Sequence, residues 1–94
     1  MATVGVLTME IQIGHAHSLK DKRQVVRSLR DRLRNRFNVS VAEIADQELH
    51  NSAVIAAVTV SASRDFAEKV LRSVEDEAAG QLGPMLIRVD LDWL

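Results

Sequence analysis

The chain has 94 residues, enough for one domain with its own hydrophobic core, and we expect a single domain over residues 1–94. It contains no cysteine, which excludes disulfides, thiolate nucleophiles and cysteine-ligated zinc. The formal net charge is only −1, but the charges are unevenly distributed. Residues 20–36 hold eight basic and two acidic residues, for a charge of +6, while the rest of the chain holds four basic and eleven acidic residues, for −7. Clustered cations of this kind attract polyanions, although a solvated helix flank is the simpler alternative.

No segment has the pattern of a membrane anchor or a signal peptide. Residues 1–13 contain no Lys or Arg and are interrupted by polar residues, unlike a secretory signal. The most apolar stretch, residues 53–60, is far shorter than the roughly 20 residues that span a bilayer. We therefore expect a cytoplasmic protein that does not interact with membranes.

The first predicted element is a strand. Apolar and polar residues alternate from Val4 to Ile13, which is the period of a strand with one buried face. Residues 14–17 then turn the chain. Ser18 followed three residues later by Asp21 resembles a capping box, so the first helix is predicted to begin near Leu19 and to end at Asn38.

This helix carries two neighbouring stripes. The apolar stripe consists of Leu19, Val26, Leu29, Leu33 and Phe37. The basic stripe consists of Lys20, Arg23, Arg27, Arg30 and Arg34. Their spacing of 3, 4, 3, 4 gathers the five basic side chains within an arc of roughly 80°, over a length of about 21 Å. Arg32 and Arg36 point away from the basic stripe and are expected only to solvate the helix.

Two strands, a second helix and a last strand follow. Residues 39–44 and 54–60 are predicted strands joined by a polar connection, and Ser63 is predicted to cap a helix whose apolar face continues to Ala78. After Gly83 and Pro84, the last strand is expected to direct one set of apolar residues to the core: Met85, Ile87, Val89, Leu91 and Trp93.

The predicted order βαββαβ, with two helices of similar length, indicates a fold of the α+β class. We expect a ferredoxin-like sandwich, with an antiparallel sheet in the order 4-1-3-2 and both helices on one face. The open face of the sheet is then predicted to be polar and mildly acidic, because it would hold Glu10, Gln12, Arg88, Asp90 and Asp92.

Two segments of the chain resemble a known family. The segments Gly14–Arg23 (GHAHSLKDKR) and Arg34–Glu43 (RNRFNVSVAE) are similar to those of the YlxP-like family of small bacterial proteins, a domain of unknown function numbered 503. The resemblance covers nearly the whole chain. It implies a ferredoxin-like fold and genes that often lie beside those of translation initiation factor two and ribosome-binding factor A, but it implies no reaction. His15 departs from the small or proline-like residues that are commoner at its position.

Neither metal binding nor catalysis is expected. His15, His17 and His50 could in principle hold a zinc ion, but the spacing is weak support and the only acidic residues near them are Asp46 and Glu48. His17 is expected instead to cap the turn before the first helix, or to contact a ligand phosphate together with the amides of the helix start. There is no nucleophile elbow and no glycine-rich phosphate loop. We predict no catalytic residues, no metal, no cofactor and no enzymatic activity.

The predicted function is therefore binding. The three aromatic residues, Phe37, Phe66 and Trp93, lie outside the first and third strands, so the sheet offers no platform for stacking bases. RNA would be contacted instead by His17, Lys20, Lys22, Arg23, Arg27, Arg30 and Arg34. We predict a non-enzymatic accessory factor that binds RNA or a ribosomal particle during translation or ribosome maturation. The alternative is a protein-interaction or small-ligand-sensing module that forms a homodimer through its open sheet face and meets an acidic protein partner.

Overall fold

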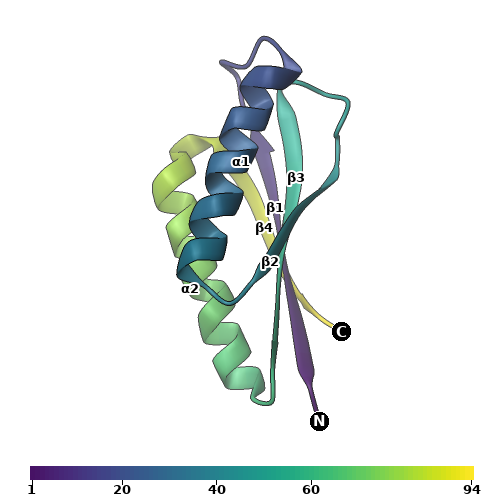
Figure 1. The fold of residues 1–94 in the computed structure, drawn as a ribbon, viewed down its shortest axis with the longest axis vertical. Coiled ribbons are helices and arrows are strands. Elements are labelled where there is room, and N and C mark those ends of the chain that lie inside the picture. The colour runs from purple at the N-terminus through teal and green to yellow at the C-terminus, as the bar shows by residue number, and fades with distance from the viewer.

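A four-stranded antiparallel sheet carries both helices on one face in the computed structural model of the chain, which describes residues 1–94 (Figure 1). The elements are β1 (Thr3–Gln12), α1 (Leu19–Arg36), β2 (Ser40–Ala45), β3 (Ser52–Ser61), α2 (Arg64–Leu82), a short 3-10 helix (Gly83–Met85) and β4 (Leu86–Trp93). The strand order is β2-β3-β1-β4, which is the predicted order read from the other edge. The ferredoxin-like α+β fold predicted from the sequence is confirmed.

Both helices begin where a serine side chain caps them, as predicted. The Oγ atom of Ser18 accepts a hydrogen bond of 3.2 Å from the backbone N–H of Asp21, and α1 starts at the next residue, Leu19. The Oγ atom of Ser63 accepts one from the N–H of Phe66 at the start of α2. Because each bond satisfies an amide that has no partner within its helix, the caps define where the helices begin. Neither helix combines the length and hydrophobicity needed to cross a membrane.

The core lies between the sheet and the helix layer. The buried side chains of β1, among them Leu7 and Met9, pack in one cluster with those of α1 and α2. Gly5 permits the closest approach, because a Cβ atom at this position would lie 2.7 Å from Cδ1 of Leu71 in α2 and 2.9 Å from Cζ3 of Trp93 in β4. A side chain at residue 5 would therefore displace α2, the end of β4 or both.

The prediction for β4 was wrong at its start. The β1–β4 pairing shifts register between Glu10 and Ile11, so that Leu86 pairs with the buried Ile11 and packs against the core. Ile87, which was expected to face the core, is 52% exposed instead. A bulge places an extra residue in the strand, and beyond it the side-chain alternation is reversed.

The open face of the sheet also differs from the prediction. The five charged or amide residues expected there occupy β4 and the end of β1, but β3 and the start of β1 present valines to the same face. The face is thus polar along one edge only, and not polar throughout as predicted.

Candidate nucleic-acid interface

The basic stripe of α1 lies beside the edge strand of the sheet. A groove of about 330 Å³ separates the helix from β2, and three members of the stripe line it: Arg23, Arg27 and Arg30. The remaining wall and floor are formed by Val26, Val41, Ala42, Glu43 and Ile55. Because 3.6 residues make one turn, the stripe keeps to the β2 side of the helix over its length.

Most of the stripe has no anionic partner within the protein. Six of the twelve Lys and Arg residues form ion pairs, and four of the remaining six belong to the stripe: Lys20, Arg23, Arg27 and Arg34. All four are exposed. Only Arg30 is paired, with the neighbouring Asp31 at 3.1 Å, and its side chain remains 38% exposed. The free cationic charge of the molecule is therefore concentrated on one helix face.

Arg32 and Arg36 do not merely solvate the helix, as was expected. Both donate to Glu77 of α2, at 2.6 and 3.0 Å, and so connect the two helices on the side away from the stripe. The hydrogen bond from Arg32, assisted by the charge of Arg36, holds the pKa of Glu77 below its usual value. These two arginines are thereby neutralised and do not add to the charge of the stripe.

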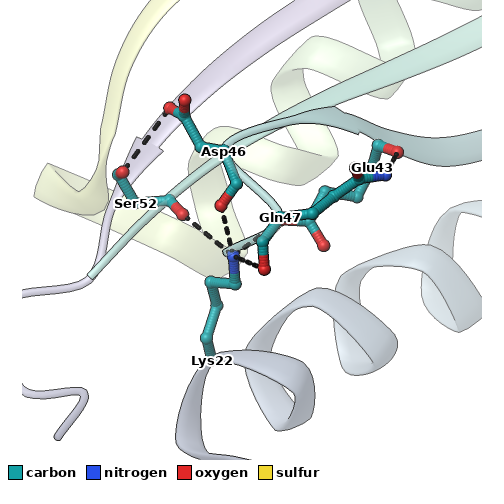
Figure 2. A network of polar contacts seen from close by, with 5 residues as sticks. All are labelled: Lys22, Glu43, Asp46, Gln47 and Ser52. Carbon is teal, nitrogen blue, oxygen red and sulfur yellow. Dashed lines mark hydrogen bonds and ion pairs between the residues drawn. The ribbon is translucent and has the colours of Figure 1, made fainter. Parts of the chain in front are cut away.

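Lys22 was predicted to contact RNA, and that prediction was wrong. Its side chain is only 1% exposed, since it points beneath the β2–β3 connection (Figure 2). Its ammonium donates to Glu43 Oε2 at 2.8 Å, to the carbonyl oxygens of Asp46 at 2.8 Å and Ser52 at 3.2 Å, and more distantly to that of Gln47 at 3.4 Å. A buried cation surrounded in this way cannot reach a phosphate in solvent.

The ion pair of Lys22 also changes the charge of the groove. Glu43 lines the groove and would repel a polyanion if it were alone. Because Lys22 neutralises it from below, Arg23 and Arg27 remain the uncompensated charges at this surface, while Arg30 is paired with Asp31. The role of Lys22 could have been found in the sequence, since it lies three residues after Leu19 and four before Val26, within the apolar stripe.

The start of α1 is not a free phosphate site. The backbone N–H of Asp21 already donates a hydrogen bond to Oγ of Ser18. The carboxylate of Asp21 in turn accepts a hydrogen bond of 3.0 Å from the backbone N–H of His17. That hydrogen bond lowers the pKa of Asp21, so the group stays ionised and would repel a phosphate at the helix start. His17 itself is exposed, and only its side chain could take part in binding.

The three histidines do not assemble into a metal site. His15, His17 and His50 are exposed, and no group of three His, Asp or Glu side chains lies in an arrangement that could hold a metal ion.

The comparisons with known proteins agree with the fold. The family described as "Protein of unknown function (DUF503)" matches residues 4–90. The chain is similar to the uncharacterized protein YlxP of Bacillus subtilis strain 168, with 38% identity over 71 residues that cover 76% of this chain and 77% of that protein. Two designed proteins share the fold. The designed protein Foldit4 has a TM-score of 0.65 and 14% sequence identity, and the match covers 100% of this chain and 97% of Foldit4. A protein designed with a ferredoxin fold has a TM-score of 0.59 and 11% identity, and the match covers 100% of this chain and 84% of the designed one.

Proposed function

This chain belongs to the DUF503 family, whose description assigns no function, and we propose from its surface that it is a non-enzymatic factor that binds RNA through α1. The RNA would be ribosomal, free or within a ribosomal particle, and the setting would be translation or ribosome maturation. A single observation carries the proposal: four exposed cations without anionic partners, Lys20, Arg23, Arg27 and Arg34, lie on one face of α1.

The chemistry of this face supports phosphate binding. Arginine donates two parallel hydrogen bonds to a phosphate group, and its charge does not depend on pH in the physiological range. The stripe extends over about 21 Å, long enough to contact several successive phosphates. The open sheet face would not compete for RNA, because Asp90 and Asp92 are exposed there and no aromatic ring is available for stacking. Recognition would consequently follow the RNA backbone more than its sequence.

The test is the salt dependence of binding to a structured ribosomal RNA fragment, measured by fluorescence anisotropy. With four to five phosphate contacts, the affinity of the wild type should fall about 10²-fold between about 50 and 200 mM salt. Arg23→Glu/Arg27→Glu should bind at least about 10²-fold more weakly at low salt and reduce the slope of log K against log salt by about two.

The matched control is Lys69→Glu/Arg72→Glu, which makes the same change in net charge on the exposed surface of α2. It should retain most of the affinity and the full salt slope, since the charges it alters lie outside the stripe. Equal losses in the two variants, or binding that is indifferent to salt, would refute the assignment to α1.

A second candidate is an extended acidic protein segment in the same groove. The observation that favours it is the apolar lining by the half-buried Val26 and Val41, which a nucleic-acid backbone would leave unused. A peptide with aliphatic residues between acidic ones should then bind more tightly than RNA, and its binding should weaken when Val41→Asp is introduced. If the peptide does not bind and the RNA does, this candidate fails.

A further inference from the structure

The open face of the sheet carries a continuous apolar patch. We define the open-face patch as Val4, Val6, Val54, Val58 and Val60; Ala56 lies between Val54 and Val58 on the same face but is only 7% exposed. The residues are direct neighbours, because Val4 pairs with Val60 and Val6 with Val58 across the β1–β3 ladder. The other face of both strands is already buried against the helices, where Leu7 and Ile55 are fully inaccessible.

This patch has no cover within the chain. Both helices lie on the opposite side of the sheet (Figure 1), and Val60 is 56% exposed. Ile87, turned outward by the bulge in β4, adds a side chain that is 52% exposed, and it lies beside Val54 and Glu10 at the same face. A sheet face that meets water normally alternates to polar residues, whereas β3 presents almost only valine and alanine. Such apolar patches on a soluble domain mark interaction sites.

We propose that the partner is a second copy of this chain, packed sheet against sheet about a two-fold axis. Strands lie about 4.8 Å apart and residues of one face about 6.8 Å apart along a strand, so the roughly 16 outward positions of this sheet cover about 520 Å² in projection. The accessible area exceeds the projected one because side chains make the surface rough. A standard interface needs roughly 600–1,000 Å² per partner, which this face can supply.

The charges on the face select one orientation. They are confined to the β4 side, where Arg88, Asp90 and Asp92 lie next to Glu10, while Ser40 and Ala42 on the β2 side carry none. If the two-fold axis ran perpendicular to the strands, in the plane between the two sheets, the acidic β4 edge of one copy would lie over the acidic β4 edge of the other. An axis along the strands instead places the β4 edge of one copy over the neutral β2 edge of its partner, on the side where the partner's basic helix lies.

This arrangement leaves α1 of each copy on the outside of the dimer. The two basic stripes would face away from the shared interface, so dimer formation and RNA binding use different surfaces. The dimer does not rest on the proposed function, and either can fail without the other.

The experiment is sedimentation equilibrium of the full chain between about 1 and 100 μM. The wild type should dimerise within this range. Val60→Glu introduces a charge at a position that is 56% exposed in the monomer, so it should fold normally and remain monomeric. A symmetric dimer contains the substitution twice, and the dissociation constant should therefore rise at least about 100-fold.

Two comparisons complete the test. Ser73→Glu, at an exposed position of α2, should dimerise like the wild type, and Arg23→Glu/Arg27→Glu should do so as well. Circular dichroism should give the same helix content for all variants. A wild-type chain that is monomeric at about 100 μM, or a dimer that persists unchanged in Val60→Glu, would overturn the proposal.

Discussion

Replacing Lys22 with methionine should destabilise the fold more than any other charge removal on α1. Methionine keeps the length and apolar character of the side chain but removes the ammonium. Glu43 would then lose its partner at 2.8 Å, and the carbonyl oxygens of Asp46 and Ser52 would lose their donor. The change thus tests the polar contacts of this side chain with little loss of its packing.

The expected size follows from burial. Removing one member of a fully buried ion pair costs about 3–5 kcal/mol, because the other charge is left without compensation. Glu43 is still 18% exposed, so water can recover part of the lost solvation. We expect Lys22→Met to lower the free energy of unfolding by about 2–4 kcal/mol, which for a domain of this size lowers the melting temperature by about 10–25 °C.

Urea unfolding followed by circular dichroism measures this directly. Lys20→Met is the matched control, since that side chain is exposed and has no ion pair, and it should change stability by less than about 0.5 kcal/mol. Lys22→Met/Glu43→Leu removes both charges and should regain at least about 1 kcal/mol relative to the single variant. If Lys22→Met proves as harmless as Lys20→Met, the reasoning about the buried ammonium is wrong.

Two further predictions concern packing and pH. Gly5→Ala should lower the free energy of unfolding by about 1–3 kcal/mol, because the new methyl group would meet Leu71 and Trp93, and thermal unfolding would reveal it. Asp21 and Glu77 have lowered pKa values in the folded state, so their stabilisation is fully present above the unfolded values near 4 and is lost as the pH falls through the folded ones. The urea midpoint should therefore decrease between about pH 5 and pH 2, and Glu77→Gln should reduce that decrease, whereas an equal decrease in this variant would show that the hydrogen bonds to Glu77 do not matter.

The overall fold was predictable because its signals are local. Strict alternation in β1, helical spacing in both helices and the two serine caps each define one element, and the order of elements leaves few topologies. The register of β4 could not be predicted, since the bulge depends on which residues of β1 it pairs with and not on its own pattern. Alternation alone therefore assigned Ile87 to the wrong face.

The candidate site, like the fold, could be predicted from the sequence only where the signal is local. The arc of the basic stripe follows from spacing alone, and the structure leaves four of its five members without partners. The burial of Lys22 and the ion pair of Arg32 depend on the carboxylates of Glu43 and Glu77, which lie 21 and 45 residues further along the chain. The residue pattern of α1 alone does not identify these partners. A charged residue within an apolar stripe was the one local signal of such a partner.

The buried ammonium of Lys22 has a consequence for how β2 chooses its alignment. An edge strand with a bulge is poorly constrained, because it pairs on one side only and a slip by one residue costs few backbone bonds. Such a slip would turn Glu43 toward the open face and leave the Lys22 ammonium enclosed without its counter-charge. The competing alignments are thereby penalised, so that one side chain on α1 fixes the position of Glu43, 21 residues further along the chain, and with it the register of β2.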